Sequence, residues 1–110
     1  MTFQIKEGDT SPTIEFQLLD GDGNGVNLTG AEVRFIMADL SGNVVVDDDT
    51  TGNVKITDAA TGKVRYDWQQ EDTNDSGTYD AEWEVTYTDS AVETFPNTED
   101  ITIRIEPDLG

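Results

Sequence analysis

Apolar and polar residues alternate along much of this chain with a period of two, which is typical of strands that bury one face. The longest alternation runs from Tyr79 to Tyr87, with Asp80, Glu82 and Glu84 among the intervening positions. No segment repeats its apolar residues with the period of an amphipathic helix. The pattern therefore predicts an all-β protein with carboxylates on its solvent-facing positions.

Segments rich in Gly, Asn, Asp and Pro divide this alternation into short strands. We expect strands at residues 14–18, 33–37, 44–46, 54–56, 64–68, 79–87, 91–95 and 101–105. Asp47-Asp48-Asp49 and Pro96-Asn97 are expected to break strands, and the polar residues 69–77 to form a long connection. This spacing predicts one domain over residues 1–110, an immunoglobulin-like antiparallel β-sandwich of seven to nine strands, with a small barrel as the alternative.

One short segment predicts a structural corner. Asp75, Gly77 and Tyr79 occur at alternate positions, in a pattern that immunoglobulin-like sandwiches place before a Cys. Ala81 stands at the position of that Cys, so the corner has no disulfide. We expect the Tyr79 hydroxyl to bond to upstream backbone; an ordinary core tyrosine after a turn is the alternative.

Asp20, Asp22 and Asn24 alternate with glycines in a way that resembles the start of a calcium-binding loop. Oxygen atoms at alternate positions can surround Ca²⁺, but the motif needs a bidentate Glu at its twelfth position. Ala31 occupies that position. Because Gly, Asp and Asn are also the residues that a hairpin turn requires, we expect a turn and no metal here, with calcium as the less favoured alternative.

Acidic residues dominate the composition: 24 Asp and Glu against 6 Lys and Arg give a formal net charge of −18. Self-repulsion of this size opposes folding in dilute buffer, whereas molar salt shortens the screening length to roughly 3 Å. The charge therefore favours a very salty medium. Phosphate binding needs clustered cations, so we expect neither nucleic acid nor an anionic membrane surface as a partner.

The residue types available argue against catalysis. The chain has no Cys and no His, which removes thiolate chemistry and the commonest general base. Ser11, Ser41, Ser76 and Ser90 therefore have no His to activate them. Chance pairs of carboxylates are unavoidable among so many acidic residues, so they are no signal of glycosidase chemistry. We expect no enzymatic activity and no cofactor.

Trp68 and Trp83 could stack on sugar rings, which would make the domain a carbohydrate-binding module. Each lies on the apolar phase of its strand, however, which favours core packing. The N-terminal residues lack the apolar region of a secretory signal, and no apolar stretch is long enough to span a bilayer. We expect neither a signal peptide nor membrane insertion.

Taken in order, five segments resemble the immunoglobulin-like domain at the N-terminus of phage baseplate upper proteins. They are residues 5–12 (IKEGDTSP), 27–35 (NLTGAEVRF), 60–68 (ATGKVRYDW), 76–83 (SGTYDAEW) and 93–97 (ETFPN). The segments extend over nearly the whole chain and are moderately specific as a set.

The resemblance implies a non-enzymatic virion component of a tailed virus, located in the tail or baseplate or serving as an adhesion scaffold, that assembles with other virion proteins and with copies of itself. Baseplate proteins of this family are generally longer, so a capsid decoration or turret protein is the alternative. The acidity points to a halophilic, archaeal host. Thr2–Lys6 and Asp100–Glu106 are candidates for edge pairing with a neighbour, although pairing within the domain is the simpler expectation.

Overall fold

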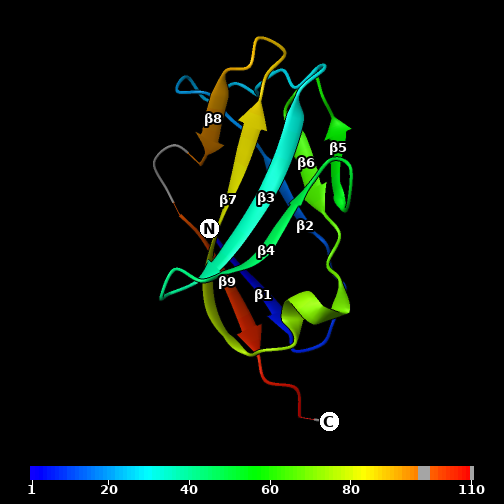
Figure 1. The fold of residues 1–110 in the computed structure, drawn as a ribbon, viewed down its shortest axis with the longest axis vertical. Helices are drawn as coiled ribbons and strands as arrows, with labels where there is room; N and C mark the ends of the chain where they lie inside the picture. The colour runs from blue at the N-terminus through cyan, green and yellow to red at the C-terminus, as the bar shows by residue number, and fades with distance from the viewer. Residues whose placement is uncertain (97–99, 110) are drawn as a thin grey trace.

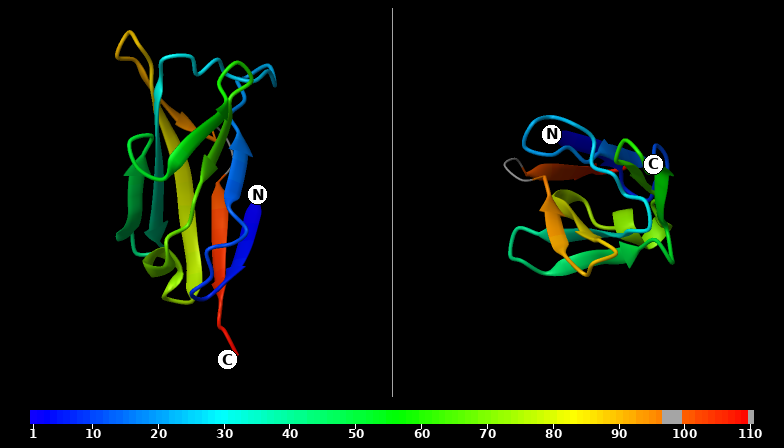
Figure 2. Two further views of the ribbon diagram at one scale, coloured as in Figure 1. Left: turned by 90° about the vertical axis from the view of Figure 1, so that its right-hand side faces the viewer. Right: turned by 90° about the horizontal axis from the view of Figure 1, so that it is seen from above.

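The computed structural model describes residues 1–96 and 100–109, which form nine β-strands in two sheets and one 3₁₀ turn. Across the larger sheet the order is β1 (Thr2–Lys6), β9 (Ile101–Glu106), β7 (Gly77–Thr86), β3 (Glu32–Asp39) and β4 (Val44–Asp49), and β8 (Val92–Phe95) also pairs with β7. The smaller sheet has the order β2 (Ile14–Gln17), β6 (Lys63–Tyr66) and β5 (Val54–Asp58). The two sheets enclose one core (Figure 1 and Figure 2), which confirms the predicted all-β sandwich.

Strand direction departs from the prediction at one pair. β1 runs parallel to β9, from Thr2 opposite Thr102 to Lys6 opposite Glu106, whereas the other described pairs are antiparallel. Side chains alternate in the same way in both arrangements, so the period of two does not report strand direction.

The expected strand break at Asp47–Asp49 is wrong. β4 continues to Asp49 and pairs with β3, with Asp47 opposite Ile36 and Asp49 opposite Arg34. Acidic residues are disfavoured in strands, and the pairing persists here because each carboxylate has a donor close by, as described below.

The polar connection contains a 3₁₀ turn at Gln70–Thr73 that the sequence did not predict. The backbone N–H of Gln69 donates to the Asp72 carboxylate at 2.8 Å, which caps the turn. At the other predicted break, β8 ends at Phe95 as expected, and Asn97 lies outside the described residues.

Aromatic rings from both sheets form the centre of the core. The ring of Phe35 on β3 lies 4.7 Å, centroid to centroid, from Tyr66 on β6 and 4.7 Å from Trp83 on β7. Trp68 contacts Phe35 and Tyr66 edge-on, at 5.9 and 5.3 Å. Such ring pairs contribute about 0.5–1.5 kcal/mol each beyond the burial of their area, so this cluster joins the two sheets.

Across the described part of the chain, we find no helix long and apolar enough to cross a bilayer.

Candidate functional site

The face of the larger sheet that points away from the core carries a group of charged side chains on three neighbouring strands. It carries the outward residues of β7, namely Asp80, Glu82 and Glu84, beside Arg34, Ile36 and Ala38 of β3 and Asp47 of β4. We call this surface the outer face. The sequence placed the three β7 carboxylates on solvent-facing positions, and the burial of their neighbours confirms that alternation.

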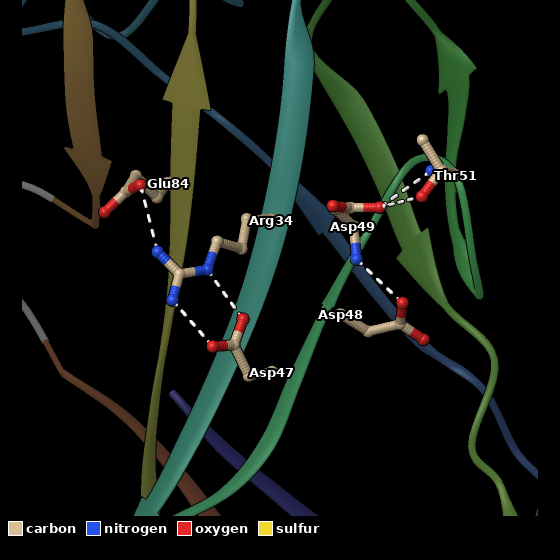
Figure 3. A network of polar contacts seen from close by, with 6 residues as sticks. All are labelled: Arg34, Asp47, Asp48, Asp49, Thr51 and Glu84. Carbon is tan, nitrogen blue, oxygen red and sulfur yellow. Dashed lines mark hydrogen bonds and ion pairs between the residues drawn. The ribbon is translucent and has the colours of Figure 1, made fainter.

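Arg34 connects three strands of the outer face (Figure 3). Its Nε and Nη2 donate to the two carboxylate oxygens of Asp47 on β4, both at 2.6 Å. Its Nη1 donates to Oε1 of Glu84 on β7 at 3.3 Å. The hydrogen bonds from Arg34 hold the pKa of Asp47 below its usual range, and the same bonds raise the pKa of Arg34. Three of the five N–H donors of this guanidinium are thus used by carboxylates of its own chain.

The acidic run at the end of β4 is a set of local caps (Figure 3). Asp48 accepts the backbone N–H of Asp49 at 2.9 Å and the side-chain amide of Asn53 at 2.8 Å. Asp49 accepts the backbone N–H and the hydroxyl of Thr51, at 2.9 and 2.5 Å, and these bonds lower its pKa. These donors satisfy the carboxylates and order the turn into β5.

A hollow of about 230 Å³ lies on the outer face beside β7. The residues that line it include three acidic ones, Asp80, Glu82 and Asp100, and the apolar Ile36, Ala38, Ala81 and Pro96. The sequence analysis did not identify it. The alternation of apolar and polar residues predicted that Asp80 and Glu82 face solvent. The position of the hollow depends on where β8 and β9 pair along β7, and the local sequence pattern does not indicate these pairing positions.

Asp20 stabilises the turn that follows β2. Its Oδ1 accepts the backbone N–H groups of Asp22 at 2.9 Å and Asn24 at 3.0 Å, and Leu19 forms a bridge with Gly25. This is the turn geometry that Asp favours. Within residues 1–96 and 100–109 no group of three or more Asp or Glu is placed to hold a metal ion. Calcium binding by Asp20, Asp22 and Asn24 remains the less favoured alternative of the sequence analysis.

The segment before β7 brings Asp75, Gly77 and Tyr79 together. The Tyr79 hydroxyl donates to the backbone carbonyl of Asp75 at 2.8 Å. Gly77 adopts φ +147°, a conformation that favours glycine. Burial raises the pKa of the Tyr79 phenol, and the negative charge of Asp75 raises it further. The contact holds the connection against the start of the strand and offers no chemistry to a ligand.

The two tryptophans are core residues. Trp83 is 0% exposed and Trp68 is 3% exposed. A carbohydrate-binding platform needs at least one of these indole faces on the surface, so the carbohydrate interpretation is wrong for these residues.

The two terminal segments pair with each other. β9 has β1 on one side and β7 on the other, so residues 101–106 are not at an edge of the sheet. β1 is the outermost strand on that side. Pairing within the domain is therefore the arrangement adopted by both candidates.

Comparison with known proteins gives one family and one fold. The family model described as the BppU N-terminal domain matches residues 2–109. No curated protein matches the chain significantly. Among solved structures, CopC from Methylosinus trichosporium OB3b is similar, with a TM-score of 0.55 and 13% sequence identity over 97% of this chain and 85% of that chain. At this identity the similarity establishes the shared fold alone.

The family match extends over almost the entire chain and contains all five segments in which the sequence resembled the family. The chain belongs to the family of phage baseplate upper protein N-terminal domains.

Proposed function

We propose that this chain is a non-enzymatic structural protein of the virion of a tailed virus, located in the tail or baseplate, where it assembles with other virion proteins and with copies of itself. The observation that carries the proposal is the family match over residues 2–109. Symmetric positions on a particle need many copies of one self-compatible domain. A sandwich with a single aromatic core supplies the rigid unit that such an assembly repeats.

Two observations support the absence of enzymatic activity in this proposal: the family match and the residue types in the chain. No His or Cys occurs in the sequence to act as a general base or nucleophile near neutral pH. Asp47, Asp48 and Asp49 are occupied by hydrogen bonds from their own chain. These carboxylates hold strands and turns in place.

We further propose that the virus infects a halophilic archaeon. Arg34, Arg65 and Arg104 each form an ion pair with a nearby carboxylate, so the arginines are already used within the domain. The formal net charge of −18 means that most carboxylates of the chain have no basic side chain to pair with. Molar salt screens the resulting repulsion, whereas dilute buffer leaves it in place.

Antibody labelling of purified virus particles, imaged by electron microscopy, tests the location. Label at the tail or baseplate is the expected result. Label over the capsid shell would instead make the protein a capsid decoration or turret protein, and its absence from particles would overturn the virion proposal.

Self-association is tested by measuring the mass of the purified protein by light scattering in about 2 M KCl and in dilute buffer. We expect an oligomer in concentrated salt, where repulsion between copies is screened. A monomer under both conditions would contradict the homo-oligomer.

A further inference from the structure

We infer that the outer face around Glu82 is a docking surface for a basic protein segment, one that presents Lys or Arg side chains together with apolar ones. The inference rests on the proposed assembly role and names the chemistry of the partner.

The hollow on the outer face lies where the described pairing of β7 changes from β9 to β8. β9 pairs with β7 as far as Ala81, which is opposite Ile101, and β8 pairs with it from Trp83, which is opposite Phe95. Glu82, between these two positions, has a described partner only on the β3 side, at Ile36. Glu82 is exposed and is one of the residues that line the hollow.

The carboxylates at this hollow have no cation of their own. Asp80, Glu82 and Asp100 form no ion pair within the described part of the chain. The neighbouring Arg34 is held by Asp47 and Glu84. The N-terminal ammonium lies 3.5 Å from the backbone carbonyl of Asp100 and makes no ion pair with its carboxylate. Negative charge on this surface is thus available to an outside cation.

An apolar strip runs beside the acidic row. Ala38 is opposite Asp80 on one side and Val44 on the other, and Val44 is 57% exposed. Leu40 and Val45, at the same end of β4, are 69% and 46% exposed. A Lys or Arg side chain matches such a surface, because its aliphatic stem packs on apolar atoms while its charged end reaches the carboxylates.

Charge decides which occupant fits. A second copy that brought its own outer face here would place carboxylates opposite carboxylates, so copies of the chain are expected to associate through other surfaces. A basic segment neutralises Asp80 and Glu82, and its apolar residues cover Val44 and Ala38. The apolar contacts also survive in concentrated salt, where the ionic ones are screened.

The test titrates the isotopically labelled full chain with the peptide acetyl-Lys-Val-Lys-Val-Lys-amide and follows backbone amide shifts by NMR. The acetyl-Glu-Val-Glu-Val-Glu-amide peptide is the control probe. The titration is run at the lowest KCl concentration that keeps the protein folded and again at about 2 M KCl. We expect the basic peptide to shift the amides of Ile36, Ala38 and Glu82, and the acidic peptide to shift none of them.

Two double variants with the same change in charge separate a site from general attraction to a polyanion. Asp80→Asn with Glu82→Gln should weaken peptide binding about tenfold. Glu15→Gln with Asp58→Asn removes two exposed carboxylates from the smaller sheet and should change binding less than about twofold. Val44→Ser should remove the binding that remains in concentrated salt.

Equal loss in both double variants, shifts centred away from the outer face, or no binding at millimolar peptide would each overturn the inference. None of these results changes where the protein lies on the particle. Failure of the docking surface is therefore distinguishable from failure of the proposed function.

Discussion

The Tyr79 hydroxyl donates a 2.8 Å hydrogen bond to the backbone carbonyl of Asp75, across the corner that leads into β7. Tyr79→Phe removes this bond and keeps the ring. We expect the free energy of unfolding to fall by about 1 kcal/mol, as for a typical intramolecular hydrogen bond. Urea denaturation at constant KCl measures the change. Unchanged stability would show that the ring alone holds the corner.

All three tyrosines should resist ionisation in the folded protein. Burial, and then a hydrogen bond to Asp72, raises the pKa of Tyr66. Burial, and then Glu93, raises the pKa of Tyr87 to about 12. Because folding raises these pKa values, the stability they contribute is present below about pH 10, the unfolded value, and is lost as the pH rises through the folded values.

Near-ultraviolet absorbance of the folded protein should therefore show little tyrosinate near pH 10. At higher pH the tyrosinate absorbance should rise steeply, and the strand signal in circular dichroism should be lost over the same pH range. The urea-unfolded chain, titrated in parallel, should ionise near pH 10. Ordinary titration of the folded chain near that pH would contradict the burial of the phenols.

Gly23 and Gly62 have nearly the same φ, but only Gly62 lacks space for a Cβ. Comparing their alanine variants therefore separates the cost of backbone strain from the cost of steric overlap. Gly62 has φ +78°, and a Cβ there would lie 2.7 Å from the carbonyl oxygen of Leu18. Gly23 has φ +83°, and no atom lies within 4 Å of its Cβ position. Gly23→Ala should cost roughly 1–2 kcal/mol for the left-handed conformation. Gly62→Ala should cost roughly a further 1–3 kcal/mol, because the backbone must move.

Urea denaturation of both glycine variants gives the comparison. Equal losses would mean that the turn at Gly62 can open to admit a methyl group without cost.

Tryptophan fluorescence tests the core directly. Trp68 and Trp83 are both buried, so acrylamide, an uncharged quencher that the acidic chain does not repel, should quench their emission weakly in the folded protein and strongly once urea unfolds it. N-acetyltryptophanamide under the same conditions gives the fully exposed reference. Quenching of the folded protein near that reference would restore a sugar-binding surface as a candidate.

The sequence predicted those features of the fold that depend on a residue and its near neighbours. Alternation predicted the buried and exposed sides of β7, since its side chains point to opposite faces. The turn at Asp20 followed from residue type, because a short acidic side chain bonds to the backbone just beyond it.

Features that depend on distant partners were missed. β4 continues through Asp47 because Arg34, 13 residues earlier, supplies two donors. The hollow at Glu82 exists because β8 and β9 pair with different parts of one strand. The order of charged residues along the chain indicates neither the contact between Arg34 and Asp47 nor the position of the hollow. The proposed docking surface could therefore be identified only from the three-dimensional arrangement.

Removal of the Arg34 charge tests whether the outer face is held by ionic contacts. Arg34→Gln leaves Asp47 and Glu84 without their cation, so we expect lower stability than the wild type near neutral pH in dilute salt. The difference should narrow in about 2 M KCl, where screening weakens the pair. Arg104→Gln is the control, because its contact with Glu106 is a single one at 3.4 Å, and its effect should be smaller.

Acid provides a second check on Arg34. The pKa of Asp47 lies below its ordinary value of 3.8, so the stability gained from this pair is present above that value and is lost as the pH falls through the folded pKa. The difference in stability between the wild type and Arg34→Gln, measured by urea denaturation, should therefore shrink progressively as the pH falls below 3.8. A difference that persists in both acid and concentrated salt would instead assign the role of Arg34 to the packing of its aliphatic stem.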